Sequence, residues 1–510
     1  MTKNNVYTVL ISLVVAMGGF LLGFDSALIS GVVPFIQSYF DLSDFQLGWA
    51  VSCLIFGAMT GNALAGPAAD KFGRKRVLIV TAILFTASAI SSALAREFWF
   101  FIAARILGGF GVGGAILIAP VYIAEIAPAE RRGRLVTFNQ LNIVIGISAS
   151  YWSNYFLLNT GANNWRFMLG IETIPALLYF TLLFLVPKSP RWLIKRGDDS
   201  QAISIMEKVG GKEYAQRSLQ LIKEHLHIVQ EKATLTGLFT KRMSFIMFIA
   251  FAIAFFQQIT GINAIFYYAP TIFEQTGGGT EAAFMQAIVI GLVNLGFTFV
   301  AIWLIDKLGR KPLLMIGTAV MAVALFVNSG AFHQANYMLS ETAFTELQSD
   351  VPEEILTKLA PVKDITYDTE DEFLAGLGKY IDRSQIEPYE SVLSAKALHI
   401  SALLVLFAII AYIAAFAISL GPVMWALLSE IFPLQLRGLA ISIVGFFNSL
   451  VSFTVTLVFP WELTNLGSSV TFLIYGIFAA LAFLFVVQYI PETKGKSLEE
   501  LETILLKSGN

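Results

Sequence analysis

Long apolar segments separated by short polar connections dominate this chain. A bilayer core about 30 Å thick needs roughly 20 apolar residues for one helical crossing. The pattern therefore predicts an all-α membrane protein with twelve transmembrane helices. The expected spans are residues 8–31, 46–69, 77–95, 98–122, 134–158, 166–187, 243–274, 282–305, 312–332, 397–428, 438–460 and 468–490.

Two motifs occur twice, which indicates an internal repeat. The pattern D-K-x-G-R-K begins at Asp70 and again at Asp306. The pattern E-x2-P-x3-R-G begins at Glu125 and again at Glu430. Each copy follows the second or the fourth span of its half, so we expect two six-helix bundles that repeat one plan.

The repeat predicts the domain boundaries. We expect an N-terminal bundle at 1–195, a cytoplasmic helical linker at 196–242, a C-terminal bundle at 243–495 and a cytoplasmic tail at 496–510, with an extracytoplasmic loop at 334–396 inside the second bundle. Apolar residues recur at helical spacing in the linker, which predicts amphipathic helices. A solvated tether is the alternative interpretation of the linker.

Composition and charge place the chain in a membrane. Hydrophobic residues make up 56% and charged residues 14%, against about 45–50% and 25% in soluble domains. Lysine and arginine cluster in the connections between spans 2 and 3, 4 and 5, and 8 and 9, and short cytoplasmic loops collect such cations. We therefore expect a multi-pass protein with both termini cytoplasmic, and the absence of Asn-x-Ser/Thr favours a bacterial cytoplasmic membrane. The net charge of −2 gives no reason to expect a nucleic-acid partner.

Two ionisable residues lie inside predicted spans, where a charge costs several kcal/mol. They are Asp25 in the first span and Arg105 in the fourth. A buried ion pair is the simplest arrangement for them. A static bridge between helices is one interpretation of this pair, and a carboxylate that gains and loses a proton is the other.

Amide and phenol side chains gather in the second half of the chain. Span 7 carries five of them, including Tyr268, and further amides lie in spans 5, 8 and 11. Amides offer donors and acceptors that can replace the hydration of a neutral polyol, although any single amide could instead bond two helices together. The predicted substrate-binding residues of this kind are Gln140, Gln257, Gln258, Asn263, Tyr267, Asn294 and Asn448.

A Gly421-Pro422-x2-Trp425 motif interrupts span 10. Proline removes a backbone hydrogen bond and glycine permits a bend. A broken helix at membrane depth can line a cavity and act as a gate. A simple proline kink is the alternative.

The motifs in combination resemble the sugar porters of the major facilitator superfamily, in particular the bacterial proton-coupled sugar symporters. Besides the repeated motifs, the resemblance is carried by R-x2-G-x2-G-x-G from Arg105, P-K-S-P-R-W-L from Pro187, Q-Q-x2-G-x-N-x3-Y-Y from Gln257 and P-E-T-K-G from Pro491. It covers nearly the whole chain apart from 334–396.

The resemblance implies roles for residues at matching positions. It implies that Asp25 titrates the coupling proton with Arg105 as its partner, and that the amides and Trp425 line the sugar site. Leu22 and Ser449 stand where stacking aromatic residues are expected, which leaves the sugar undetermined. It also implies a charge network that latches the two halves, made of Asp70, Arg74, Glu125, Arg132, Asp306, Arg310, Glu430 and Arg437.

These patterns predict a symporter that imports a monosaccharide, a pentose or a hexose, with a proton. A facilitative uniporter and a transporter-like sugar sensor are the alternatives. The four histidines lie outside the polar spans, and we find no catalytic or metal-ligand pattern. We therefore expect no enzyme activity, no cofactor and no metal. The expected partners are the sugar, the proton and the lipid bilayer, and we expect a monomer.

Overall fold

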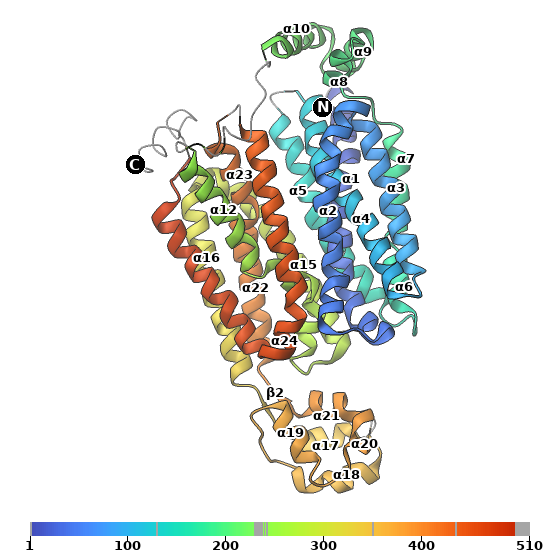
Figure 1. Ribbon diagram of the computed structural model, residues 1–510, viewed down its shortest axis with the longest axis vertical. Helices are drawn as coiled ribbons and strands as arrows, with labels where there is room; N and C mark the ends of the chain where they lie inside the picture. The colour runs from blue at the N-terminus through green and yellow to red at the C-terminus, as the bar shows by residue number, and fades with distance from the viewer. Residues whose placement is uncertain are drawn as a thin grey trace.

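The computed structural model is all-helical apart from one small sheet, and it describes residues 3–128, 131–228, 238, 240, 243–348, 351–433 and 436–494. The first half of the chain forms one bundle and the second half forms another beside it (Figure 1). The helices of the first bundle are α1 (Lys3–Phe40), α2 (Asp44–Phe72), α3 (Arg74–Ala93), α4 (Phe98–Ile126), α5 (Arg132–Leu157), α6 (Asn164–Gly170) and α7 (Thr173–Leu183).

The second bundle repeats this plan with more breaks in its helices. Four expected spans are affected. Span 7 is divided into three shorter helices and span 10 into two, and spans 11 and 12 form one helix kinked at Gly467, where φ is 74°. The helices are α12 (Ser244–Ile259), α13 (Ile262–Tyr267), α14 (Ala269–Glu274), α15 (Gly279–Leu308), α16 (Arg310–His333), α22 (Ala402–Ile418), α23 (Leu420–Ile431) and α24 (Arg437–Tyr489).

Ten helical segments of the described chain are long and apolar enough to cross a membrane. One of them, α24, contains two of the expected spans. The fifth expected span, α5, is not among the ten, and it carries Gln140, Asn142 and Asn154. It nevertheless packs between α1 and α15 in the bundle. All twelve expected spans are therefore helical, and the predicted all-α membrane fold is confirmed.

The linker between the bundles lies at one end of the molecule (Figure 1). Ala202 and Met206 of the linker are buried against the first bundle. This arrangement agrees with amphipathic helices rather than a solvated tether over residues 190–228. The linker helices are α8 (Pro190–Lys195), α9 (Asp199–Gly210) and α10 (Lys212–Ile228). Most of 229–242 and the predicted tail at 496–510 lie outside the described residues.

The long connection between α16 and α22 forms a small domain at the opposite end of the molecule (Figure 1). It has its own apolar core, which includes Leu339, Phe373 and Leu393. We call it the insert. Its elements are β1 (Asn336–Tyr337), α17 (Glu341–Leu347), α18 (Glu353–Leu359), η1 (Ala360–Val362), α19 (Glu370–Leu377), α20 (Arg383–Ile386), η2 (Glu387–Tyr389), α21 (Glu390–Ala397) and β2 (Leu398–His399), with β1 antiparallel to β2.

The two bundles meet at the end where the insert lies, which we call the insert end. There Asp44 accepts a hydrogen bond from Thr464 at 3.2 Å, and Phe45 stacks on Trp461. One apolar core continues across both bundles at this end. At the linker end, the first bundle and the linker helices share a separate core of described residues, and the second bundle's residues at that end, such as Met243 and Phe432, belong to the other core.

Candidate functional site

The predicted proton pair is an ion pair between α1 and α4. Arg105 donates to Asp25, and each side chain is 1% exposed. Helix α4 packs closely against α2 near Arg105. A Cβ added at Gly109 or Gly113 would lie 2.4 or 2.1 Å from backbone oxygens of α2. Helix α4 is therefore pressed against its neighbour, and the residue one turn before Gly109 is enclosed.

A second buried carboxylate lies beside the pair and was missed in the sequence. Glu172 is 2% exposed at the break between α6 and α7. It interacts electrostatically with both Asp25 and Arg105, and its Oε1 has no hydrogen-bond partner among the described residues. The signal was present, since an acid inside the expected span 166–187 deserves the same attention as Asp25.

Four of the predicted substrate residues form one hydrogen-bonded amide cluster. Gln258 donates to Asn448 at 3.1 Å and to Gln257 at 3.2 Å. Asn448 donates to Gln257 at 2.9 Å, and Asn263 donates to Gln258 at 2.9 Å. Gln257, Gln258 and Asn448 are each less than 9% exposed. The cluster joins α12, α13 and α24, so spans 7 and 11 meet through their amides.

A break in span 7 makes this cluster possible. The sequence analysis predicted an uninterrupted helix over 243–274, but α12 ends at Ile259 and α13 begins at Ile262. Gly261 between them has φ of 90°, a left-handed conformation that favours glycine. A Cβ there would also meet the ring of Tyr475 at 2.4 Å. The turn brings Asn263 back onto Gln258 across the break.

Tyr267 lies between the amide cluster and the proton pair. It ends α13, one helical turn after Asn263, and its hydroxyl is hydrogen-bonded to Ser26 of α1. It also interacts electrostatically with Asp25 and Arg105. The side chain is 7% exposed. One tyrosine therefore contacts the residue next to the acid while its own short helix carries a cluster amide.

Two further predicted residues face each other across the bundles. Ser148 and Tyr151 of α5 approach Gly291 of α15. Residues three apart share a helix face, so Asn294 lies on the face of α15 that meets α5. Gln140 lies about three helical turns before Tyr151 and therefore on the same side of α5. Gln140 is exposed and Asn294 is 6% exposed. Within the described structure neither is hydrogen-bonded to the amide cluster, so the structure does not join them to it.

The break in span 10 lies slightly before the predicted position. Helix α22 ends at Ile418, and Ser419 has a non-helical backbone with φ of −124° and ψ of −101°. Gly421 and Pro422 then occupy the first turn of α23, where proline costs no helical hydrogen bond. Trp425 is 42% exposed and packs over Gly445 of α24. The cluster contacts the broken helix directly, since Gln257 donates to the Leu420 carbonyl at 2.9 Å.

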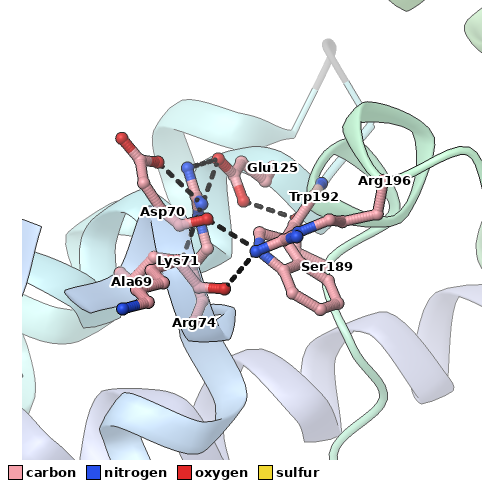
Figure 2. Close-up of polar contacts among 8 residues, drawn as sticks. All are labelled: Ala69, Asp70, Lys71, Arg74, Glu125, Ser189, Trp192 and Arg196. Atoms are coloured by element: carbon pink, nitrogen blue, oxygen red, sulfur yellow. Dashed lines mark hydrogen bonds and ion pairs between the residues drawn. The ribbon is translucent and has the colours of Figure 1, made fainter. Parts of the chain in front are cut away.

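The predicted charge network forms separately in each bundle. In the first bundle, Arg74 bonds to Asp70 at 3.0 Å and to Glu125 at 2.9 Å, and Ser189 donates to Glu125 at 2.5 Å (Figure 2). Trp192 of α8 donates to the Asp70 carbonyl at 3.1 Å. These contacts tie the linker to the ends of α2, α3 and α4.

The second bundle repeats the same contacts. Arg310 bonds to Glu430 at 2.7 Å, and Thr493 donates to Glu430 at 2.6 Å. Arg437 donates instead to the Phe432 carbonyl at the end of α23, at 3.3 Å. The side chains of Arg132 and Asp306 lie outside the described residues. Sequence reasoning missed Ser189 and Thr493, which complete the matching triads.

The comparison with known families gives one match. The model of the sugar (and other) transporter family matches residues 11–343 and 391–505. Two curated relatives are the arabinose-proton symporter of Bacillus subtilis, 33% identical over 98% of this chain and 96% of the relative, and the D-xylose-proton symporter of Escherichia coli K12, 34% identical over the same shares.

Solved structures agree with the sequence relatives. The inward-open conformation of the xylose transporter XylE from Escherichia coli matches with a TM-score of 0.75, 34% identity, and coverage of 97% of this chain and 99% of that chain. A partially occluded inward-open conformation of the same transporter matches with a TM-score of 0.73. The fold, the buried polar site and the full-length likeness lead to one conclusion: this multi-pass membrane protein belongs to the sugar transporter family, and it is a carrier rather than an enzyme.

Proposed function

We propose that the protein is a proton-coupled symporter that imports a monosaccharide, a pentose or a hexose, by alternating access. The observation that carries the proposal is the enclosed pair of Asp25 and Arg105, each 1% exposed, beside a cluster of amides. A charge pair at membrane depth is costly, and such residues commonly serve ion or proton pathways. Two relatives, an arabinose-proton symporter and a D-xylose-proton symporter, support the same activity.

The amide cluster and its surroundings suit a neutral sugar. Amides present both donors and acceptors to hydroxyl groups, and Trp425 adds a partly exposed ring. The residues named in the cluster carry no net charge, so an anion finds no counter-charge among them. In the present state the cluster amides bond to one another, so sugar binding exchanges these bonds for bonds to sugar hydroxyls.

The sidedness of the molecule follows from its cations. The linker end carries the Arg74 and Arg310 networks, and cytoplasmic loops concentrate such residues. We place the linker end and both termini in the cytoplasm of a bacterium, and the insert outside. The bundles meet at the insert end, so the described state faces inward. A single chain contains the complete site, which is consistent with a functional monomer.

The proposed coupling passes from the acid to the sugar site through Tyr267. A proton from outside neutralises Asp25 and weakens its attraction to Arg105. Glu172 is a second carboxylate that can then pair with the guanidinium. When the attraction between Asp25 and Arg105 weakens, α1 can move. Because Ser26 of α1 interacts with Tyr267, this movement is transmitted to Tyr267 and to α13, the short helix that holds Asn263. A membrane potential of 100 mV contributes about 2.3 kcal/mol per proton, which supports more than tenfold accumulation.

A facilitative uniporter is the second candidate. The near-complete burial of the pair favours it, because an enclosed pair can act as a fixed bridge between α1 and α4. Both candidates bind sugar and exchange it across the membrane. They differ in whether sugar entry moves a proton.

The test uses de-energised cells that express the protein in weakly buffered medium. Addition of a transported sugar should raise the external pH, and a protonophore should abolish this alkalinisation. A panel of xylose, glucose, galactose, fructose, arabinose and inositol identifies the sugar. Counterflow exchange of the same sugar without any pH change would show a uniporter instead.

A further inference from the structure

The family match leaves out most of the insert. The match stops at residue 343 and resumes at residue 391. The unmatched segment nevertheless contributes to a folded domain with its own core. The ends of the insert pair as strands, with Asn336 opposite His399 and Tyr337 opposite Leu398. This pairing holds the domain beside the ends of α14 and α16 and the kink of α24.

A cavity of about 610 Å³ lies between the insert and the bundle. Helix α14 contributes Thr271, Glu274 and Gln275 to its lining, and the insert contributes Asp368 and Ser394. Ligand sites commonly occupy junctions between domains and have volumes of about 300–1,000 Å³. The cavity is therefore large enough for a small solute, and neither domain forms it alone.

The lining has the chemistry of a polyol site. Hydroxyl, amide and carboxylate groups surround the space, and Phe332 and Tyr337 add aromatic rings. The lining contains no Lys, Arg or His, so a phosphate or a carboxylate ligand would meet uncompensated negative charge from Glu274 and Asp368. Neutral sugars fit this combination, because carboxylates accept bonds from sugar hydroxyls and rings cover apolar C–H faces.

Two hydroxyl groups in the lining lack partners within the described structure. They are Thr271 Oγ1 on the bundle side and Ser394 Oγ on the insert side. Ser394 is only 6% exposed. Both oxygens are themselves buried in this state, and buried polar atoms normally have hydrogen-bond partners. A rotation of each side chain toward the cavity would give both hydroxyls a partner on a bound polyol.

The cavity also adjoins the contact that closes the insert end. Thr464 lines the cavity and donates to Asp44 of the other bundle at 3.2 Å. Ser468, also in the lining, donates to Gln275 at 2.5 Å. A solute held in the cavity therefore lies next to the residues that must separate when this end opens.

We propose that this cavity is a second sugar-binding site, formed jointly by the insert and the bundle and distinct from the amide cluster. It holds a neutral monosaccharide beside the outer entrance. Its ligand class rests on the proposed function, since we take the ligand to be the sugar that the protein carries. Its existence rests on the cavity, its polar lining and the unpaired hydroxyls.

Equilibrium dialysis of the purified full-length protein with tritiated sugars from the panel above tests the proposal. The wild type should bind two sugars per chain, and Gln258→Ala should weaken the central site alone, about tenfold or more. Thr271→Val and Ser394→Ala should each lower the sugar affinity of the cavity site about tenfold, as expected for a lost hydrogen bond in a buried setting. Ser384→Ala, in the exposed helix α20 of the insert, is the matched control and should leave both sites unchanged.

Each remaining outcome has a defined meaning. One site per chain that Gln258→Ala weakens would overturn the second site and leave the proposed function standing. One site that Gln258→Ala spares and Ser394→Ala weakens would support the cavity and contradict the central site. Absence of binding for every sugar would overturn both.

Discussion

Arg105 in α4 is paired with Asp25 in α1, and neither side chain is more than 1% exposed. Removing one partner of a buried pair leaves an uncompensated charge, which typically costs about 3–5 kcal/mol. The cost should be smaller when Asp25 is the partner removed, because Glu172 offers Arg105 a second carboxylate. The pair is therefore asymmetric in its tolerance of substitution.

Arg105→Met should destabilise the protein more than Asp25→Asn does. The methionine variant leaves two carboxyl groups, Asp25 and Glu172, without their cation, and the expected loss is about 3–5 kcal/mol. The asparagine variant keeps Glu172 beside Arg105, so its loss should be smaller. Thermal unfolding midpoints in detergent compare the two variants.

The control for charge removal is Arg96→Met, at an exposed position before α4. It should leave the midpoint nearly unchanged. Equal losses for Arg105→Met and Asp25→Asn would show that Glu172 does not support the guanidinium, and would remove it from the proposed coupling route.

The amide cluster should determine sugar affinity. Gln258 bonds to Asn448, Gln257 and Asn263, so Gln258→Ala should weaken sugar binding about tenfold or more through the loss of donors and acceptors. Asn465→Ala removes an exposed amide of α24 and serves as the matched control. Isothermal titration with the transported sugar measures both. Unchanged affinity in Gln258→Ala would place the sugar elsewhere.

Gly48 should control closure of the insert end. A Cβ at this position would lie 1.9 Å from the Leu457 carbonyl of the other bundle, so Gly48→Leu cannot adopt the described packing of α2 on α24. The variant should populate states in which the insert end is open. Spin labels on Gln46→Cys and Asn465→Cys, in a Cys53→Ala background, should report a longer distance.

Gly296→Leu is the matched control for this prediction, because no atom lies within 4 Å of an added Cβ at Gly296. It should keep the wild-type distance distribution. If Gly48→Leu also keeps the wild-type distribution, the contact between Gly48 and Leu457 is not what holds this end closed.

Hydropathy predicted the helices well because each span must bury its backbone bonds within the bilayer. The same rule identified Asp25 and Arg105, which are rare at membrane depth. The breaks were harder to predict. Gly261 has a positive φ, and the ring of Tyr475 also occupies the space that a Cβ there would need. That contact joins residues more than 200 positions apart in the chain.

The insert shows a different limit of sequence analysis. Its helices have between four and eight residues, too few for a hydrophobic period to stand out. The cavity exists because Ser394 of the insert and Thr271 of the bundle line the same space. No local sequence pattern encodes this arrangement, because it arises from how the insert packs on the bundle.

The most direct test of proton coupling compares two assays of Asp25→Asn in proteoliposomes. The amide retains the shape of the carboxyl group but cannot exchange a proton at this site. Counterflow exchange of the transported sugar should continue, while accumulation driven by an imposed pH gradient should fall to the level of liposomes without a gradient. Undiminished gradient-driven accumulation in Asp25→Asn would contradict the assignment of Asp25 as the coupling group.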